Sequence, residues 1–533
     1  MEALSTQGGR PGGPRRAGAL VLVGFMGAGK SSGARKLAAE LGCEALDSDK
    51  ELEAALGEPI EQFFDRQGEA AFREREEQTI VALLARDDAE VVALGGGALG
   101  SQRVRDALRD HTVVHLDVRA EDAWRRAAGK GRPLARDRDR FEALYAERRA
   151  VYESVADALL PPNGRDVARR ALPALNALRE ARADGIADIR LIWAETASGN
   201  YPVFFGRGLI DSGFMYPVDG RRFIVTDANV AARKFRLADG DHISIQPGET
   251  EKTLASVEKV LGDLAAPPAE WDEPGPAERG DIIVALGGGV VGDLAGFCAA
   301  IYQRGMRHVQ VPTTLVAQVD SAYGGKTGVD IAEGKNYAGA YHQPSAVICD
   351  PSALETLPPE ELAAGYAEVV KTALIAGGPL WARVRRGGEV DDDTILGCLR
   401  TKLAIVAEDE RDGGRRQVLN LGHTVAHAIE SATGYSRYRH GEAVGVGLLA
   451  ALRLSGQDAL RDEIAGLLAD HGLPLAFDGT TVDEVVALTE RDKKREGGRV
   501  PFVLLQAPGE VTPGHAVTPE ALRAAVEEIH AGG

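Results

Sequence analysis

Residues 19–31 read Ala-Leu-Val-Leu-Val-Gly-Phe-Met-Gly-Ala-Gly-Lys-Ser, an apolar run followed by a glycine-rich turn. The run predicts a short buried strand, and residues 31–41 have the spacing of a helix. The turn matches G-x-x-x-x-G-K-[ST], in which backbone N–H groups and a helix N-terminus face phosphate groups. We expect Lys30 to contact the β- and γ-phosphates of a nucleotide and Ser31 to contact Mg²⁺. The stretch therefore predicts an α/β domain that binds a nucleoside triphosphate.

Strand and helix patterns alternate from this motif to about residue 160. Apolar strand patterns occupy residues 91–94 and 112–116, and a helical pattern covers residues 68–84. Such alternation is typical of a domain with a parallel sheet. The predicted divisions of this part of the chain are a disordered tail at 1–18, a first domain at 19–180 and a linker at 181–188.

The second part of the chain begins as another α/β region and becomes mostly helical. Strand patterns lie at residues 222–226 and 281–286, and helical patterns dominate after Pro358. The helical patterns cover residues 360–375, 394–408, 423–433 and 442–454. We therefore expect an α/β half at 189–357 and a helical half at 358–533.

Composition narrows the function classes. The chain has 533 residues, 44% of them hydrophobic, and a net charge of −18. This size predicts several domains, and the acidic balance argues against non-specific binding to nucleic acid or an anionic membrane. The four cysteines are far apart, which fits buried thiols in a reducing cytoplasm rather than disulfides. No run of about 18 apolar residues predicts a membrane span, and the N-terminus lacks the apolar stretch of a secretory signal.

Further polar residues of the first domain have the types needed for phosphoryl transfer. Asp47 and Asp49 are predicted to end a strand and point the same way, one toward Mg²⁺ and the other toward a substrate hydroxyl. Arg73 lies on a predicted helix with Glu76 three residues later to hold it. Arg132 lies in a Gly/Pro-rich segment that resembles a mobile lid over such a site.

Six motifs in order make residues 19–180 resemble shikimate kinase. They are the glycine-rich turn, the D-x-D pair, F-R-x-x-E at 72–76, G-G-G at 95–97, R-P-L at 132–134 and the helix segment 147–152. The resemblance implies a P-loop kinase-type fold and ATP-dependent 3-phosphorylation of shikimate, with Asp49 as a base and Arg132 stabilising the transferred phosphoryl group. It implies ATP contacts by Gly27, Ala28, Gly29, Lys30, Ser31, Ser32, Arg126 and Arg132, and Mg²⁺ contacts by Ser31 and Asp47. It implies shikimate contacts by Asp49, Arg73, Gly95, Gly96, Gly97 and Arg148. One departure is Arg149-Ala150, where the family commonly has Asn-Pro.

A second glycine motif follows the strand pattern at 281–286. Residues 287–292 satisfy G-x-G-x-x-G and precede a plausible helix, which hints at a dinucleotide pyrophosphate on a helix N-terminus. No acidic residue ends a following strand about 20 residues later, as a standard Rossmann unit requires. From these residues alone, dinucleotide binding stays open.

Three histidines within eighteen residues predict a metal site. His423 and His427 are i, i+4 neighbours on a predicted helix, a spacing that suits Zn²⁺. The third ligand is His440 or a carboxylate such as Glu368. Cobalt and iron stay open as alternatives to zinc, because His and carboxylate ligands accept several metals. Lys371 lies three residues after Glu368, so both can face one pocket, and other lysines among glycines predict an anion site.

Residues 187–533 resemble 3-dehydroquinate synthase over nearly their whole length. Matching stretches include 287–296, 302–305, 310–314, 318–320, 324–327, 334–336, 368–371, 420–427, 440–442 and 492–494. The resemblance implies an N-terminal α/β NAD-binding half and a C-terminal, mostly helical metal-binding half. It implies that Glu368, His423 and His440 hold Zn²⁺ (or Co²⁺), and it assigns His427 to the substrate phosphate, against the spacing argument.

The resemblance also implies the remaining site residues. NAD would contact Glu249, Lys252, Gly288, Gly289, Val290, Asp293, Thr313, Thr314, Asp320, Lys326, Lys335 and Thr356. Substrate would contact Arg304, Asn336, Lys371, Lys402, Arg416, Asn420, His427, and Lys493 or Lys494. The residues implied as catalytic are Lys326, Lys371, Asn420 and His427, and Arg304 would come from the partner in a homodimer.

The two resemblances together predict a bifunctional enzyme of the shikimate pathway. The second reaction would convert 3-deoxy-D-arabino-heptulosonate 7-phosphate to 3-dehydroquinate with loss of phosphate, using NAD catalytically. Departures from the family are Tyr323, Asp330 and Tyr341-His342. They leave open a related sugar-phosphate cyclase that makes another cyclitol, and a second alternative keeps one half only as a binding or regulatory module. Because the two steps are not consecutive, fusion gives no reason to expect channelling.

Overall fold

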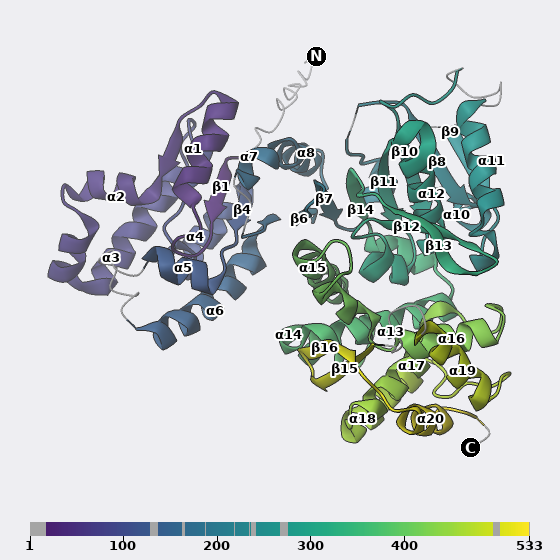
Figure 1. The fold of residues 1–533 in the computed structure, drawn as a ribbon. Coiled ribbons are helices and arrows are strands. Elements are labelled where there is room, and N and C mark those ends of the chain that lie inside the picture. Colours follow the sequence, from purple (N-terminus) through teal and green to yellow (C-terminus); the bar gives the residue numbers. More distant parts are fainter. Residues whose placement is uncertain are drawn as a thin grey trace, which may run out of the picture. The chain divides into compact units, whose positions relative to one another are not determined.

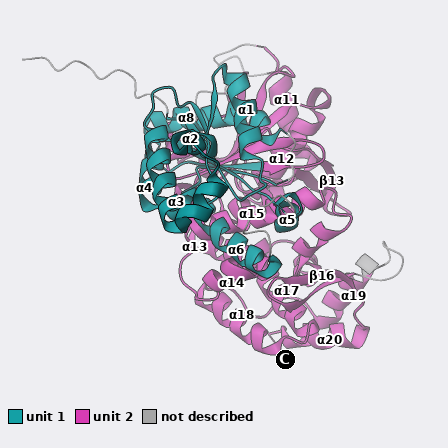
Figure 2. Cartoon of the chain, turned by 90° about the vertical axis from the view of Figure 1, so that its left-hand side faces the viewer, with its two compact units in different colours: residues 1–193 teal, residues 194–533 magenta. Residues whose placement is uncertain are grey.

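A computed structural model of the chain separates into two compact units, Met1–Trp193 and Ala194–Gly533, coloured separately in Figure 2. The structure describes residues 18–127, 137–162, 166–186, 188–217, 219–233, 235, 241–266, 275–493 and 501–531. The tail predicted at 1–18 lies outside these residues apart from Gly18. Arg132 with its lid and Lys494 also lie outside them, and the side chain of Lys493 is not described.

The first unit is built on parallel strands in the order β2-β3-β1-β4-β5-β6. Figure 1 shows two of these neighbours, β1 and β4, side by side. Its strands are β1 (Leu20–Val23), β2 (Ala45–Asp47), β3 (Val91–Ala93), β4 (Thr112–Leu116), β5 (Ala158–Leu160) and β6 (Arg190–Glu195). Strand β1 lies between β3 and β4, and all four of its residues are buried. An uninterrupted apolar run is expected there because a parallel sheet is covered on both faces.

Helices connect these strands, as the sequence predicted. They are α1 (Lys30–Leu41), α2 (Ser48–Leu56), α3 (Ile60–Leu84), α4 (Gln102–Ala107), α5 (Ala120–Ala127), α6 (Arg138–Val155), α7 (Val167–Arg170) and α8 (Leu172–Ala183). Helices α7 and α8 are separate, because Pro173 lies in the first turn of α8 and has no N–H to continue the helix before it. Helix α3 contains a kink at Gly68, whose φ is 80°.

The prediction that Asp47 and Asp49 extend from one strand end is wrong. Strand β2 ends at Asp47, and Asp49 already belongs to the first turn of α2. The carboxylate of Asp47 caps this helix by accepting from the Asp49 backbone N–H at 3.1 Å. A side-chain acceptor at the N-cap stabilises the first turn, so the chain leaves the strand two residues earlier than the pattern suggested.

The second unit opens with parallel strands in the order β7-β14-β11-β10-β8-β9. Its strands are β7 (Asn200–Phe205), β8 (Arg222–Asp227), β9 (Asp241–Ile245), β10 (Ile282–Gly287), β11 (Arg307–Pro312) and β14 (Ala346–Cys349). Helices of this half are α9 (Leu209–Ser212), α10 (Ala228–Ala231), α11 (Leu254–Ala265) and α12 (Gly289–Ile301). An antiparallel hairpin of β12 (Lys326–Ile331) and β13 (Gly334–Tyr341) packs against α12.

The rest of the second unit is mostly helical, as predicted. Its helices are α13 (Pro359–Ala376), α14 (Gly378–Val384), α15 (Asp392–Glu408), α16 (His423–Ala432), α17 (His440–Leu454), α18 (Asp458–Asp470), α19 (Val482–Lys493) and α20 (Pro519–Glu528). Helix α17 contacts both α13 and α16. A hairpin of β15 (Phe502–Ala507) and β16 (Glu510–His515) was not predicted from the sequence. The predicted fold class, α/β domains followed by a helical half, is confirmed.

Two further expectations concern cysteines and membrane segments. All four cysteines have free thiols, and three of them are buried. Within the described residues, no helix combines the length and the apolar character that crossing a membrane requires.

Candidate active sites

The glycine-rich turn of the first unit joins β1 to α1 and has backbone angles that favour glycine. Gly24, Gly27 and Gly29 have φ values of 147°, 84° and 92°. The Lys30 ammonium donates to the carbonyl oxygens of Gly24 at 2.8 Å and Phe25 at 3.3 Å, so the side chain lies over its own loop. This places a cation beside the N-terminus of α1, where phosphate groups bind.

Residues predicted to bind the substrate that accepts the phosphoryl group lie close together at the turn after β3. This turn contains Gly95–Gly97, and neighbouring side chains occupy the space that side chains at Gly95 and Gly97 would need. A Cβ on Gly95 would lie 2.6 Å from Asp49 Oδ1, and a Cβ on Gly97 would overlap the Arg73 guanidinium. Arg73 Nη1 lies 2.6 Å from Glu76 Oε2, the i, i+3 contact that the sequence predicted. The missing side chains thus allow a carboxylate and a guanidinium to approach the same backbone segment.

Helix α6 adds a second cation to this turn. Arg148 Nη1 and the Tyr152 hydroxyl donate to the Gly96 carbonyl oxygen at 3.0 and 2.5 Å. Arg149, which replaces the family's usual asparagine, forms ion pairs with Asp117 at 3.2 Å and Glu153 at 2.9 Å. Arg149 therefore has a structural role, and the departure leaves Arg148 in place.

The remaining predicted residues of the first unit lie on the glycine-rich turn or next to it. Arg126 Nη1 donates to the Gly27 carbonyl oxygen at 2.7 Å, which places a guanidinium against the loop. Ser31 and Ser32 are exposed in the first turn of α1, and Ala28 is half-buried. Asp47 is half-buried at the end of β2, where one carboxylate oxygen caps α2.

The second unit encloses a cavity of about 1130 Å³ between the sheet, the β12–β13 hairpin and the starts of α13, α16 and α17. This volume can hold a dinucleotide together with a small substrate. The predicted residues that line it are Glu249, Lys252, Gly288, Gly289, Val290, Asp293, Thr313, Thr314, Asp320, Lys326, Lys335, Asn336, Thr356, Lys402, Asn420, His423, His427 and His440.

Glycines and a buried ion pair form the sheet side of this cavity. Helix α12 begins at Gly289, directly after β10, so its N-terminus faces the cavity as G-x-G-x-x-G predicts. Lys252 Nζ lies 2.5 Å from Asp293 Oδ2. Burial works to lower the pKa of Lys252, but Asp293 and Glu249 raise it above its usual value. The ammonium therefore stays charged inside the cavity wall.

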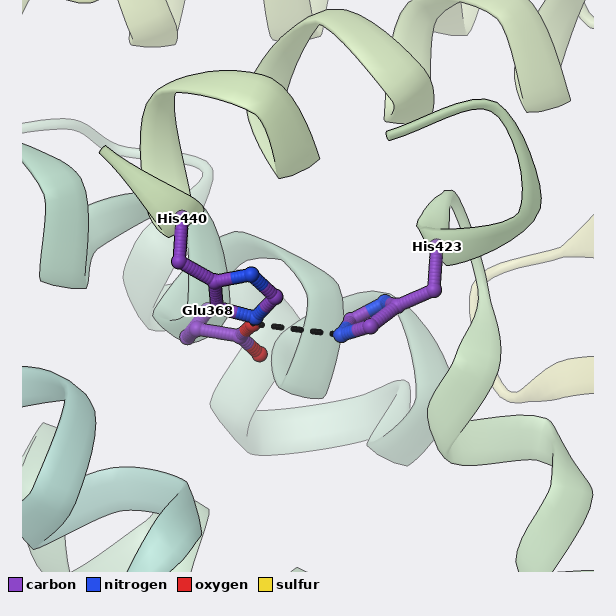
Figure 3. A group of neighbouring side chains, drawn as sticks. All are labelled: Glu368, His423 and His440. Atoms are coloured by element: carbon purple, nitrogen blue, oxygen red, sulfur yellow. Dashed lines mark ion pairs between the residues drawn. The ribbon is translucent and has the colours of Figure 1, made fainter. Parts of the chain in front are cut away.

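A carboxylate and two imidazoles converge at the helical side of the cavity. Glu368 lies in the middle of α13, while His423 and His440 are the first residues of α16 and α17. Figure 3 shows the three side chains pointing toward one another. Nε2 of His423 and Nε2 of His440 lie 3.5 and 3.4 Å from Glu368 Oε1. Their potential ligand atoms all lie within 4.8 Å of one another, so one ion could contact all three.

The electrostatics of this cluster fit a divalent cation. Both carboxylate oxygens of Glu368 are buried without a hydrogen-bond partner among the described residues, although the Lys371 ammonium is 2.5 Å from Oε2. Burial works to raise the pKa of Glu368, but Lys371 and the two histidines hold it well below its usual value. Burial lowers the pKa of His423 to about 3, which keeps this imidazole neutral. A buried carboxylate and a neutral imidazole are a donor set that Zn²⁺ or Co²⁺ prefers.

His427, which the helix spacing favoured as a ligand, belongs to a second group. Its ring, with Glu430 and His440, forms another set of potential ligand atoms within 4.8 Å. His440 is shared by both groups. Burial works to lower the pKa of His440, but the neighbouring carboxylates of Glu368 and Glu430 raise it to about 9.

Three cations surround the base of the cavity. Lys402 Nζ lies 2.5 Å from Asp320 Oδ1, and Lys371 Nζ lies 3.8 Å from Asp320 Oδ2. Burial works to raise the pKa of Asp320, but Lys371 and Lys402 lower it to about 2. Arg416 is 1% exposed, and its Nη2 donates to the Gly324 carbonyl oxygen at 3.0 Å.

Some predicted residues do not line the cavity. Lys371, Arg416 and Glu368 lie behind its wall, and Arg304 lies after α12 with a φ of 68°. Lys326, in contrast, does line the cavity, where it is about half-exposed and forms an ion pair with Asp412.

Sequence reasoning missed several charged or polar residues of the cavity. Asp227 ends β8, caps α10 by accepting from the Asn229 and Val230 N–H groups, and lines the cavity with Asn229. The sequence did contain a signal for Asp227, because an acidic residue follows an apolar strand there. It was not recognised because Asp227 lies before the glycine motif, whereas a standard Rossmann unit has its acidic residue after that motif. Glu430 on α16 does not line the cavity but lies 3.3 Å from His440 Nδ1, and it gives no signal in the sequence beyond its helical position.

Comparison with known proteins assigns both units to families. The shikimate kinase model matches residues 26–178, and the models for the N-terminal and C-terminal parts of 3-dehydroquinate synthase match residues 242–364 and 365–495.

Curated relatives and a solved structure match the second unit. The 3-dehydroquinate synthase of Halorhodospira halophila is 40% identical over 355 residues, 63% of this chain and 98% of that protein. That of Caulobacter vibrioides is 42% identical over 363 residues, 62% of this chain and 95% of that protein. ValA, a 2-epi-5-epi-valiolone synthase from Streptomyces hygroscopicus solved with NAD⁺ and Zn²⁺ bound, is 25% identical with a TM-score of 0.55. That comparison covers 62% of this chain and 96% of ValA.

Proposed function

Because the chain belongs to the 3-dehydroquinate synthase family and carries a shikimate kinase domain before that part, we propose that it catalyses two steps of aromatic amino-acid biosynthesis. The first unit transfers a phosphoryl group from ATP to the 3-hydroxyl of shikimate. The second unit converts 3-deoxy-D-arabino-heptulosonate 7-phosphate to 3-dehydroquinate and phosphate. The observation that most supports the proposal is the Glu368, His423 and His440 cluster, whose two histidines line a cavity of dinucleotide size.

In the kinase unit, catalysis depends on positioning and charge. Lys30 and the N-terminus of α1 bind the phosphates of ATP, with Mg²⁺ held near Ser31 and Asp47. Arg73 and Arg148 hold the carboxylate of shikimate against Gly95–Gly97. Asp49 Oδ1 faces the same turn, where it accepts the proton of the attacking hydroxyl. Arg132 in the lid neutralises the transferred phosphoryl group.

In the cyclase unit, Glu368, His423 and His440 would hold Zn²⁺ or Co²⁺. When bound, the ion polarises the substrate's hydroxyl or carbonyl oxygen, and NAD accepts and returns a hydride. The neutral imidazole of His423 keeps a lone pair available for the ion. On the sheet side of the cavity, Gly288–Val290 at the N-terminus of α12 would hold the pyrophosphate of NAD, and the Asp227 carboxylate would accept from a ribose hydroxyl.

Substrate occupies the space between the metal ligands and the cations. Lys371, Lys402 and Arg416 supply positive charge for the carboxylate of the substrate, and Lys326, Asn336, Asn420 and His427 bind its phosphate and hydroxyl groups. Because Asp320 already neutralises Lys402 and Lys371, substrate binding must rearrange these ion pairs. Arg304, Lys493 and Lys494 complete the site, with Arg304 supplied by a partner in a homodimer.

A related cyclase that makes another cyclitol is the second candidate. ValA has the same fold at 25% identity, whereas the curated 3-dehydroquinate synthases reach 40–42%. The higher identity over nearly the full length of those proteins favours the dehydroquinate product.

The decisive experiment identifies products from the purified full chain. With NAD⁺, Zn²⁺ and the heptulosonate phosphate, we expect 3-dehydroquinate and one equivalent of phosphate by NMR. With ATP and Mg²⁺, we expect ADP release that depends on shikimate. Lys30→Met should abolish only the kinase reaction, and Glu368→Gln should abolish only the cyclisation. A different carbocycle, or ADP release without shikimate, would contradict the proposal.

We also propose the domain boundaries of the two enzymes and their location in the cell. We infer a kinase at 19–180, a linker at 181–188, an NAD-binding half at 189–357 and a metal-binding half at 358–533. Four unpaired cysteines fit a reducing compartment, which supports a cytoplasmic location.

A further inference from the structure

Each ring nitrogen of His440 faces a different buried carboxylate. Nε2 lies 3.4 Å from Glu368 Oε1, and Nδ1 lies 3.3 Å from Glu430 Oε1. Glu430 is 3% exposed and lies on α16, ten residues before His440. A neutral imidazole carries one N–H and one lone pair, so the group that accepts the N–H decides which nitrogen can bind a metal ion.

Glu430 is itself held in place from the opposite side. The Lys335 ammonium lies 3.1 Å from Glu430 Oε1 and 2.9 Å from Glu249 Oε1. A buried carboxylate without a cation would be costly, so Lys335 allows Glu430 to stay at this position. The same ammonium connects Glu430 to the Glu249 carboxylate, on the sheet side of the cavity.

We propose that Glu430 is a positioning residue for the metal centre. Its Oε1 accepts the Nδ1–H of His440, so that when a metal ion displaces the Nε2 proton the lone pair of Nε2 is directed toward Glu368 and His423. The inference rests on the proposed function, because it assumes that these three residues hold the ion. Metal-binding histidines usually donate their other N–H to such an acceptor, and loss of that acceptor weakens metal binding about 10–100-fold.

A second ion is the competing interpretation. His427, Glu430 and His440 could together contact a cation, and Glu430 Oε2 has no hydrogen-bond partner among the described residues. However, Oε1 already contacts both Lys335 and His440 Nδ1, so an ion at this oxygen would lie beside an ammonium group. The charges therefore favour a hydrogen bond over a second ion.

The test measures metal binding by the full chain rather than turnover. Metal-free protein is titrated with Co²⁺, and its visible absorption is recorded; Zn²⁺ affinity is measured by competition with a chromophoric chelator. The variants are Glu430→Gln, which keeps an acceptor oxygen, and Glu430→Ala, which removes it. Glu410→Gln is the matched control, because Glu410 is a buried carboxylate of the same unit that bonds to Ser198 and Gln343 instead.

We expect one tightly bound ion per wild-type chain. Glu430→Gln should weaken Zn²⁺ binding about 10-fold and Glu430→Ala about 100-fold, with altered Co²⁺ absorption bands in the alanine variant. Glu410→Gln should stay within about two-fold of wild type. If Glu430→Ala does not fold, the inference is tested by the Zn²⁺ affinity and the Co²⁺ absorption spectrum of Glu430→Gln.

Three results would overturn the inference. They are wild-type affinity in both Glu430 variants, two tightly bound ions in the wild-type chain, or an equal loss in Glu410→Gln. Failure of the proposed function is distinguishable, since wild-type protein would then bind no ion at the Glu368, His423 and His440 cluster.

Discussion

Gly97 occupies a position where a methyl group would displace a charged side chain. A Cβ there would overlap the guanidinium of Arg73, which Glu76 holds at 2.6 Å. The proposed shikimate site therefore depends on an absent side chain as well as on the charged residues around it.

Replacing Gly97 with alanine should impair shikimate binding and leave ATP binding intact. Loss of a charge-assisted hydrogen bond costs about 1.5–3 kcal/mol, so kcat/KM for shikimate should fall about 10–100-fold. Steady-state kinetics with shikimate varied at saturating ATP measure this, and the KM for ATP should stay within about two-fold. Gly100→Ala is the control, because no atom lies within 4 Å of a Cβ there. An unchanged KM for shikimate in Gly97→Ala would remove Arg73 from the proposed site.

Individual residues differ in how well the sequence predicts them. The Arg73–Glu76 contact follows from i, i+3 spacing, and the structure shows it. Asp227 had a local signal at the end of a strand, whereas Glu430 could not be predicted, because its role depends on a side chain distant in sequence. A buried acid on a helix looks the same as a solvated one until its partner, here Lys335, is known.

At the level of elements, close helix packing brings the metal-binding residues together. Helices α13 and α17 contact each other, and a Cβ on Gly441 would overlap the Ala364 carbonyl oxygen. Gly441 follows His440, and Ala364 lies one turn before Glu368 on α13. The packing of these two helices therefore sets the separation of the two ligands.

Gly441→Ala should weaken metal binding and destabilise the second unit. The methyl group must push the start of α17 away from α13, which costs about 1–3 kcal/mol, and we expect at least a ten-fold loss of Zn²⁺ affinity. Chelator competition and urea unfolding of the full chain measure the two effects. Gly466→Ala is the control: the site is exposed within α18 and open, so the change should stabilise the unit by about 0.5–1 kcal/mol. Wild-type affinity in Gly441→Ala would show that helix separation does not limit the site.

Element predictions succeeded where the pattern was long or fully apolar. Strand β4 matches residues 112–116, and α13 begins one residue before the predicted 360–375 segment. The β15–β16 hairpin was missed because the apolar run of β15 at 502–505 is too short to distinguish a strand from a helix, and the mostly exposed β16 lacks an apolar period. The Asp47 and Asp49 prediction failed because a side-chain cap starts α2 earlier than strand periodicity implies.

At the scale of the whole molecule, each unit has its own buried core. One hydrophobic cluster in the first unit includes Val21, Phe25 and Phe141. Another in the second unit includes Val225, Ile283 and Leu294. The proposed ligands divide in the same way, with ATP in the first unit and NAD in the second. Two separate cores predict that each unit unfolds in its own transition.

Calorimetry of the full chain should therefore show two transitions that respond to different ligands. Binding to the native state alone stabilises by about 2.7 kcal/mol when the ligand is present at one hundred times its Kd. ADP with Mg²⁺ should raise the midpoint of one transition by several degrees, and NAD⁺ should raise the other. Lys30→Met is the control, since it should abolish the ADP response and preserve the NAD⁺ response. A single transition whose midpoint both ligands raise would mean that the two units unfold together. The prediction of one unfolding transition for each hydrophobic core would then be wrong.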